Sequence, residues 1–266
     1  ESDFKISDEV VVNPAISCGA CPPCKKGLSC ELVKILGYKT QGGYAEFVVV
    51  PIEQLYLKPQ NISFIEAAAF PLTFLTAWHM LVTRANLQKG ETVFIWGASG
   101  GLGSSAIQIA KYLGATVIAA TKSAEDAEYI KKMGADEIVV YMNNNVVEEV
   151  KKITDNRGVD VVFESVGAKT WNMSLNMLHP YGRVVIAGTT SGDIGTQDLS
   201  DIYYMQLTVF GARMGTKEEF KKIVDLVGQG KLKPIVDKIF KLKDAQEAHK
   251  RLEEGKQKGK IVLEID

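Results

Sequence analysis

The sequence predicts an α/β fold built on a doubly wound parallel sheet, joined to a second, β-rich part. Short, continuously apolar runs are typical of strands buried on both faces of a parallel sheet. Apolar residues recur at helical spacing between the first two runs, so strand and helix alternate as in βαβ units. The six runs cover residues 91–96, 116–121, 137–141, 160–165, 182–188 and 208–213.

The two ends of the chain follow a different pattern. Residues 1 to about 78 are β-rich and irregular, with strand-like stretches at 8–13 (DEVVVN) and 43–51 (GYAEFVVVP). Towards the C-terminus we expect helices at 216–229 and 243–254, and then a strand in GKIVLEI at 259–265. The chain is long enough for one large or two ordinary domains.

The overall charge and hydropathy exclude several classes of partner. The chain has 31 basic and 32 acidic residues, a net charge of −1, which gives no electrostatic reason to bind nucleic acid or an anionic membrane. No apolar run reaches the roughly 18 residues that span a bilayer, and no signal-peptide pattern is present. We therefore expect a cytoplasmic protein with no nucleic-acid or membrane partner.

A glycine-rich turn follows the first apolar run and opens an amphipathic helix. Glycines at this spacing allow a tight turn, close approach of a pyrophosphate, and a helix N-terminus that presents free N–H groups. The next strand follows about twenty residues later, as the dinucleotide-binding motif requires. The alternative is a purely structural strand–helix turn. The predicted cofactor-binding residues of the turn are Gly97, Gly100, Gly101, Leu102 and Gly103.

The end of the second strand bears on which dinucleotide binds. NAD sites usually carry Asp or Glu there, to accept hydrogen bonds from the ribose hydroxyls. Here the position is Thr121, followed by Lys122 and Ser123. A small polar residue and a cation suit a 2′-phosphate, which favours NADP(H) over NAD(H). The alternative is that Lys122 is an ordinary solvated lysine.

All four cysteines lie in one short stretch, at Cys18, Cys21, Cys24 and Cys30. In a reducing compartment such a cluster indicates a metal site rather than disulfides. Four thiolates in one loop predict a closed tetrahedral zinc site that stabilises the fold and leaves no coordination position for chemistry. An iron–sulfur cluster and unligated thiols remain the alternatives.

Several motifs, in this order, resemble those of the medium-chain dehydrogenase/reductase superfamily, which includes zinc alcohol dehydrogenases and quinone oxidoreductases. They are the cysteine lobe, GGYAEFVVVP, AAAFPLTFLTAWHML, GASGGLG and the terminal GKIVLEI. The resemblance implies a GroES-like catalytic domain at 1–78, a Rossmann domain at 79–231, and a segment at 232–266 that returns to the catalytic domain. It also implies a homodimer or homotetramer, through the strand in 207–214.

The chain departs from the family pattern in two places. The resemblance implies a further stretch before FKISDEVVV that carries ligands of a catalytic zinc, so we expect the catalytic domain to be partial at its N-terminus. The family lobe has seven residues between its third and fourth cysteines, whereas this chain has five, residues 25–29. A shorter loop can still close on a metal, and Cys30 is the predicted ligand whose position departs from the family spacing.

The resemblance also predicts that the catalytic zinc is missing. Zinc alcohol dehydrogenases carry a cysteine ligand four residues before the position of Thr76, and this chain has Leu72 there. Leucine cannot bind zinc. The histidines at 79, 179 and 249 are expected to be surface or packing residues, and His179 is expected in a Pro-containing loop.

The remaining site residues are implied by the same resemblance. Thr76 would pack against the nicotinamide, and Val166 and Gly188 would lie beside its ring. Lys260 would reach the pyrophosphate, and Tyr141 would lie near the adenosine or the phosphate. No residue is identified as a proton donor.

Without zinc, the chemistry would depend on the cofactor and its position. A nicotinamide can pass hydride to a quinone or an α,β-unsaturated carbonyl if the protein aligns the two. An alcohol must first become an alkoxide, which zinc promotes. The hypothesis is therefore an NAD(P)H-dependent reductase of quinones or enones. The alternatives are a zinc-type alcohol dehydrogenase acting on small alcohols or aldehydes, and a non-catalytic dinucleotide-binding protein.

Overall fold

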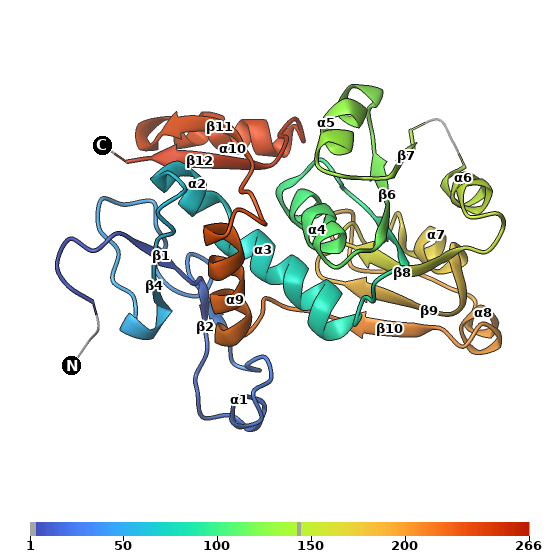
Figure 1. The fold of residues 1–266 in the computed structure, drawn as a ribbon, viewed down its shortest axis with the longest axis horizontal. Helices are drawn as coiled ribbons and strands as arrows, with labels where there is room; N and C mark the ends of the chain where they lie inside the picture. Colours follow the sequence, from blue (N-terminus) through green and yellow to red (C-terminus); the bar gives the residue numbers. More distant parts are fainter. Residues whose placement is uncertain (1–3, 143–144, 266) are drawn as a thin grey trace. The chain divides into compact units, whose positions relative to one another are not determined.

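The computed structural model describes residues 4–142 and 145–265. It divides into two compact units (Figure 1). Unit 1 runs to Leu75 and resumes at Met214, and unit 2 is Thr76–Arg213. The boundaries between the two units, at 75/76 and 213/214, therefore differ from the expected domain boundaries at 78/79 and 231/232. Helix α9 (Lys217–Gly228), which we expected in the Rossmann domain, belongs to unit 1.

Unit 2 contains a parallel sheet in which each of the six predicted runs forms one strand. Among the described residues its strand order is β10-β9-β8-β5-β6-β7, and all neighbouring strands are parallel. The strands are β5 (Thr92–Ile95), β6 (Thr116–Thr121), β7 (Glu137–Val140), β8 (Val159–Glu164), β9 (Leu178–Ile186) and β10 (Thr208–Gly211).

The helices of unit 2 connect these strands. From β5 the chain moves outward to β7, then returns to β8 on the other side of β5 and continues to β10. Right-handed crossovers place the helices of the two halves on opposite faces. The reversal between β5 and β8 is a topological switch point, where ligands bind at the carboxyl ends of the strands. The helices are α4 (Gly101–Tyr112), α5 (Ala127–Lys132), α6 (Val146–Ile153), α7 (Trp171–Asn176) and α8 (Leu199–Tyr204), with a 3-10 turn η3 (Ala124–Asp126) (Figure 1).

The core of unit 2 explains why the strands are continuously apolar. Phe94, Trp96, Ile118 and Val162 are completely buried within it. All six residues of β8 are buried, because neighbouring strands and helices cover this central strand on every side. Two of the six are acidic, which distinguishes β8 from the other strands.

Helix α3 (Pro71–Trp78) leads from unit 1 into unit 2 and continues as a π-helical segment, η2 (His79–Arg84). Such segments are rare, and they are frequently found at functional sites. The Arg84 side chain donates to the Gly211 carbonyl oxygen at 2.9 Å, which connects the end of η2 to strand β10. His79 is buried, in line with its expected packing role.

The described part of unit 1 contains three two-stranded sheets. They are β1 (Val10–Val12) with β4 (Leu55–Leu57), β2 (Ala15–Ile16) with β3 (Lys34–Ile35), and β11 (Val236–Lys241) with β12 (Lys260–Glu264); the first two are antiparallel and the last is parallel. Its other elements are α1 (Pro22–Lys25), η1 (Ile52–Gln54), α2 (Phe64–Ala69), α9, η4 (Leu242–Asp244) and α10 (Ala245–Glu253). Helices α2 and α9 begin with capping boxes, Ser63 with Glu66 and Thr216 with Glu219.

Two local predictions were wrong. Residues 43–51 form no strand, and Phe47 and Val49 are 87% and 97% exposed. A β-branched run becomes a strand only where a partner strand and a packing surface are available. In the described structure this run has neither. His179 lies in strand β9, where we had expected a loop, because the strand begins at Leu178. No helix in the described ranges is long and apolar enough to cross a membrane.

Candidate functional site

The glycine turn lies between β5 and α4, at the switch point of the sheet. Gly97 has a φ of +60°, which favours glycine. A Cβ on Gly103 would lie 2.3 Å from the Gly97 carbonyl oxygen, so only glycine lets helix and strand approach this closely. Because α4 begins at Gly101, the N–H groups of its first turn have no intrahelical acceptor. The turn can therefore bind an anion such as a pyrophosphate.

The loop after β8 lies next to this turn. A Cβ on Gly97 would be 3.8 Å from Ser165 Oγ, so the two loops are close neighbours. The Val166 N–H donates to Glu164 Oε1 at 2.7 Å. The Val166 carbonyl oxygen accepts from both the N–H and the hydroxyl of Ser191, each at 2.7 Å. Val166 is thus fixed from two directions.

The loop after β9 joins the loop after β8. Gly188 adopts a φ of +127°, and the Ala168 N–H donates to the Gly192 carbonyl oxygen at 3.0 Å. A Cβ on Gly167 would lie 2.7 Å from that same oxygen, so a side chain there would push the loops apart. The predicted residues Val166 and Gly188 therefore lie on two loops that hold each other in place.

A cavity of about 240 Å³ opens between these two loops. Small-molecule sites usually measure about 300–1,000 Å³, so this cavity suits one ring-sized group rather than a whole dinucleotide. The Asp193 carboxylate accepts a hydrogen bond from the Thr189 hydroxyl at its edge. The lining residues are Gly167, Ala168, Trp171, Ile186, Thr189, Gly192, Asp193 and Gly195.

The end of β6 presents both a cation and a carboxylate. Thr121 is buried, and its hydroxyl donates to Asp126 Oδ2 at 3.3 Å. Lys122 is exposed, and the Ser123 hydroxyl caps the N–H of Glu125 at 3.1 Å. The sequence analysis missed Asp126, although an acid five residues beyond a strand end within TKSAED could have indicated it.

Tyr141 lies against the core of unit 2. Its ring meets that of Trp96 edge to face, with centroids 5.5 Å apart. Burial raises the pKa of Tyr141, so the phenol stays neutral at physiological pH. The predicted contact between Tyr141 and the adenosine remains a prediction.

Three further residues lie on other elements. Thr76 is buried in α3, and Leu72 in the first turn of the same helix is 42% exposed. Lys260 is the first residue of β12, and burial lowers its pKa. Thr76 belongs to unit 2 and Lys260 to unit 1. The roles of Thr76 and Lys260 towards the nicotinamide and the pyrophosphate stay predictions.

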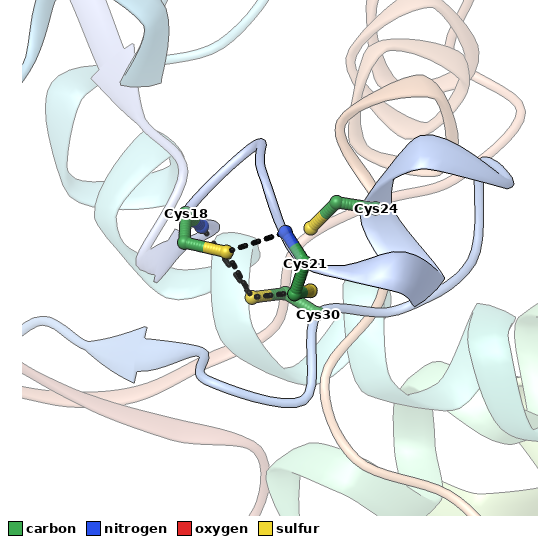
Figure 2. A group of neighbouring side chains, drawn as sticks. All are labelled: Cys18, Cys21, Cys24 and Cys30. Atoms are coloured by element: carbon green, nitrogen blue, oxygen red, sulfur yellow. Dashed lines mark hydrogen bonds between the residues drawn. The ribbon is translucent and has the colours of Figure 1, made fainter.

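The four cysteines form a compact cluster in unit 1 (Figure 2). Their four Sγ atoms all lie within 4.8 Å of one another, and the Cys18–Cys30 and Cys21–Cys30 pairs are 3.6 and 3.9 Å apart. A zinc ion with Zn–S bonds of about 2.3 Å requires tetrahedral sulfur separations of about 3.8 Å. The donor set and its spacing therefore fit a tetrahedral zinc, and the short loop before Cys30 does not prevent closure.

The backbone of the lobe already favours a thiolate at one position. N–H groups of Ala20 and Cys21 point at Cys18 Sγ and lower the pKa of Cys18 to about 6. The pKa of Cys24 is raised to about 12, mainly by a hydrogen bond with Cys21 and to a lesser extent by burial. Four neighbouring thiols cannot all ionise without a cation. A zinc ion would supply that cation and would hold all four as thiolates.

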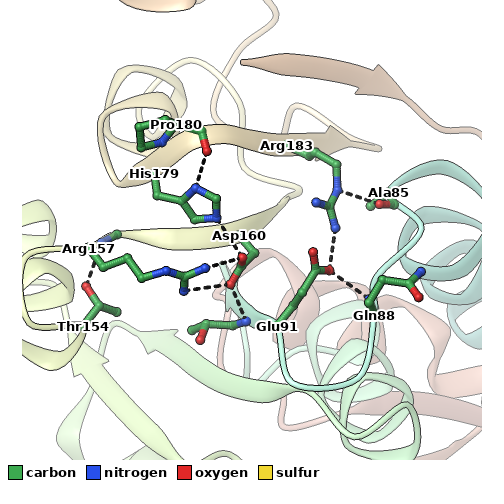
Figure 3. A network of polar contacts seen from close by, with 11 residues as sticks. Ala85, Gln88, Glu91, Thr154, Arg157, Asp160, His179, Pro180 and Arg183 are labelled. Carbon is green, nitrogen blue, oxygen red and sulfur yellow. Dashed lines mark hydrogen bonds and ion pairs between the residues drawn. The ribbon is translucent and has the colours of Figure 1, made fainter. Parts of the chain in front are cut away.

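A polar network lies at the opposite, amino end of the same sheet (Figure 3). Asp160, in β8, accepts from the Thr92 N–H at 2.8 Å, from Arg157 at 2.7 Å and from His179 Nε2 at 2.7 Å. Burial alone would raise the pKa of Asp160, but these hydrogen bonds and the Arg157 charge outweigh it and lower the pKa. His179 therefore has a structural partner, as its expected packing role requires.

A second ion pair extends this network (Figure 3). Arg183 contacts Glu91 at 2.6 Å and donates through Nε to the Ala85 carbonyl oxygen at 2.7 Å. It thereby connects β9 to the segment that leads into β5. None of the predicted site residues belongs to this network, which fixes the amino end of the sheet, remote from the glycine turn.

Comparisons with known proteins agree with this geometry. Residues 1–60 match the alcohol dehydrogenase GroES-like domain, and residues 101–229 match the zinc-binding dehydrogenase family. The NAD-dependent alcohol dehydrogenase of Sulfolobus acidocaldarius is 35% identical over 266 residues, which cover 98% of this chain and 76% of that protein. The quinone oxidoreductase of Pseudomonas aeruginosa is 32% identical over 231 residues, 84% of this chain and 71% of that protein. A crystal structure of an NAD-dependent alcohol dehydrogenase, 41% identical, matches with a TM-score of 0.95 over 100% of this chain and 78% of that one.

The chain belongs to the medium-chain dehydrogenase/reductase superfamily. It is an NAD(P)-dependent oxidoreductase of this superfamily. The predicted fold, a Rossmann-type parallel sheet together with a GroES-like domain, is confirmed.

Proposed function

We propose that the chain transfers hydride from NADPH to a quinone or an α,β-unsaturated carbonyl without a catalytic zinc. The observation that carries this proposal is Leu72, on the first turn of α3. It occupies the position at which the resemblance implies a cysteine ligand of the catalytic zinc, and an alkyl side chain cannot bind metal. The similarity to a quinone oxidoreductase supports the same reaction class.

The residues of this chain would position the cofactor rather than react with it. A bound nicotinamide supplies the hydride. The free N–H groups of the first turn of α4 would bind the pyrophosphate. The two joined loops at 165–167 and 188–192 would hold the nicotinamide end, and their glycines let a flat ring approach the backbone closely. Alignment of this kind accounts for much of the rate of hydride transfer to an activated acceptor.

We also propose a preference for NADP(H) over NAD(H). It rests on Lys122, an exposed cation at the end of β6, and on the uncharged Thr121. Asp126 argues for the opposite choice, because its carboxylate could accept from the ribose hydroxyls of NAD. Titration of both cofactors into Lys122→Ala and Asp126→Asn separates the two readings. Loss of one charge-assisted hydrogen bond should weaken NADPH by about tenfold in the first variant and leave NADH unchanged. Tighter binding of NADH, abolished in the second variant, would contradict the NADP preference.

The cysteine cluster is proposed to hold one structural zinc. The sulfur spacing and the four-thiol donor set support it. Elemental analysis of the purified protein should find one zinc and no iron per chain. A second zinc per chain would contradict the absence of a catalytic metal, and iron would indicate an iron–sulfur cluster instead of a zinc site.

The reaction itself is tested by following NADPH oxidation with a quinone, an enone and an aldehyde as acceptors. The quinone and the enone should be reduced, and NADP⁺ reduction by primary alcohols should be slow, because the proposed site has no zinc to lower the pKa of the alcohol hydroxyl. A zinc-type alcohol dehydrogenase is the second candidate, since an NAD-dependent alcohol dehydrogenase is 35% identical. Fast alcohol oxidation that needs a second equivalent of zinc would establish it. Tight cofactor binding with no turnover of any substrate would instead indicate a non-catalytic binding protein.

Association into a homodimer is proposed through β10. In the described structure this strand pairs only with β9 and forms one edge of the sheet, and Val209 within it is 45% exposed. An exposed edge presents unpaired backbone groups to another strand. Light scattering should give twice the chain mass, and Val209→Lys should shift the mass towards the monomer.

A further inference from the structure

One acidic residue at the carboxyl end of the sheet has no role in the cofactor contacts described above. Glu164 is the last residue of β8, and it is completely buried. Its Oε1 accepts from the N–H groups of Val166 and Gly167 at 2.7 and 3.0 Å. Its Oε2 accepts from the hydroxyls of Thr170, at 2.9 Å, and Ser174. All four of its partners are donors.

These partners show what the carboxylate does. A buried charge is costly unless hydrogen bonds replace its water. Two of the four bonds of Glu164 go to the backbone of the loop at 165–167, and the other two go to Thr170, the N-cap of α7, and to Ser174 within that helix. The side chain therefore sets the direction of two consecutive N–H groups and connects the loop to the helix that follows.

The loop lies where the second half of a dinucleotide would bind. In doubly wound sheets, two mononucleotide-binding halves meet at the switch point. The glycine turn belongs to the β5–β6 half, and the loop at 165–167 follows β8 in the other half. Gly97 and Ser165 are close neighbours at the switch point, where the two halves meet. The loop that Glu164 fixes would thus face the nicotinamide rather than the adenosine.

We propose that Glu164 is a positioning residue whose carboxylate shapes the loop at 165–167 for the nicotinamide half of the cofactor. The inference rests on the proposed dinucleotide-binding function. The carboxylate is enclosed and all its bonds lie within the protein, so it acts through the loop and does not touch the reacting atoms.

A glutamine does not satisfy this site. In Glu164→Gln, an amide oxygen turned towards the loop would leave the NH₂ group facing the two hydroxyls. Ser174 Oγ already accepts from Trp96 Nε1 at 2.8 Å, so its own proton would lose its acceptor. The opposite amide orientation would point the NH₂ group at the two loop N–H donors. Either way the loop or its anchor loses a hydrogen bond.

The test compares a whole cofactor with its adenosine fragment. Calorimetry gives the Kd of NADPH and of 2′,5′-ADP for the full chain, or of NADH and AMP if the wild type prefers NADH. Glu164→Gln should weaken the dinucleotide by about tenfold, the equivalent of roughly one hydrogen bond, and leave the fragment within about twofold. If the Gln variant does not fold, Glu164→Asp decides. Aspartate keeps the charge but is too short to reach all four donors. It should change the ratio of dinucleotide to fragment affinity in the same direction.

Asp160 provides the matched control, because it is a buried acid at the other end of the same strand. Asp160→Asn should lower the unfolding temperature and leave the ratio of dinucleotide to fragment affinity unchanged. An unchanged ratio in the Glu164 variant, or an equal change in the Asp160 variant, would overturn the positioning role. A wild-type chain that binds neither cofactor would instead count against the proposed function.

Discussion

Gly103 offers a direct test of the glycine turn. It lies in the first turn of α4, facing the turn residues Gly97 and Ala98. A Cβ at this position would lie 2.3 Å from the Gly97 carbonyl oxygen and 2.7 Å from the Ala98 Cα. Both obstacles are backbone atoms, so no side-chain rotation can relieve the clash. Gly103→Ala must therefore move the helix away from the strand.

The size of the effect follows from this geometry. Restoring an ordinary contact of 3.4 Å requires a shift of about 1 Å between the helix and the turn. Overpacking of this kind costs about 1–3 kcal/mol. The higher helix propensity of alanine returns at most about 1 kcal/mol, so the clash should dominate. Because the obstacle is backbone at 2.3 Å, we take the upper part of that cost, about 2–3 kcal/mol, which leaves a net loss of about 1–2 kcal/mol. At about 3 °C per kcal/mol, the unfolding temperature should fall by roughly 3 to 6 °C.

Gly100 is the control for this substitution. A Cβ at Gly100 would lie 3.5 Å from the same carbonyl oxygen, an ordinary contact, and its φ of −76° suits any residue. Calorimetry and thermal unfolding of Gly100→Ala and Gly103→Ala then separate the backbone clash at position 103 from the general effect of replacing a glycine of this turn with alanine. Gly103→Ala should also weaken the dinucleotide by at least about tenfold, because the shifted N–H groups no longer meet the pyrophosphate. A Gly103→Ala protein with wild-type stability and affinity would refute the assignment of this turn.

Three further predictions concern the metal, the pH dependence and the joined loops. Cys21→Ser should release the zinc and lower the unfolding temperature while cofactor affinity stays unchanged; an unchanged zinc content would refute the four-cysteine site. The pKa of Asp160 is lowered in the folded state, so its contribution to stability is complete above the unfolded value of about 3.9 and is lost as the pH falls through the folded value. Asp160→Asn should therefore flatten the acid limb of unfolding free energy against pH, and an unchanged slope would count against the network. Gly167→Ala places a Cβ 2.7 Å from the Gly192 carbonyl oxygen at a φ of +91°, so stability should fall and the dinucleotide should bind more weakly than its adenosine fragment does; equal losses would contradict the position of this loop.

The parallel sheet could be predicted from the sequence because its signal is local. A strand buried on both faces needs an unbroken apolar run, and each run is separated from the next by a helix-sized segment. The glycine turn was equally visible, since Gly97 and Gly103 are required by the backbone itself. The cysteine lobe was visible because its four cysteines lie within thirteen residues of one another.

The predicted strand at 43–51 failed for a reason that no local pattern reveals. Its residues have strong β propensity, but propensity is expressed only where another strand supplies hydrogen bonds and a packing surface. The pattern at Phe47 and Val49 indicated what the segment could form. Whether it forms a strand depends on neighbours that lie far away in the sequence.

The acids at 126, 160 and 164 were missed for a related reason. An isolated acid within or just after a strand does not reveal its partners, which lie up to 68 residues away for Asp160 and Thr92. The sequence DVVFES did contain a signal, because an acid at the last position of a buried strand must find several donors to be tolerated. Interpreting that signal requires the loop and helix that supply the donors.

The two acids of β8 show how one strand can separate stability from binding. Both carboxylates are buried, so each requires hydrogen bonds that offset the loss of water. At the amino end, Asp160 bonds Arg157, His179 and the start of β5, which fixes elements of the scaffold to one another. At the carboxyl end, Glu164 bonds the loop that follows, which a ligand at the switch point could meet. The same residue chemistry at the two ends of one strand should therefore give different phenotypes, a shift in stability at Asp160 and a shift in cofactor discrimination at Glu164.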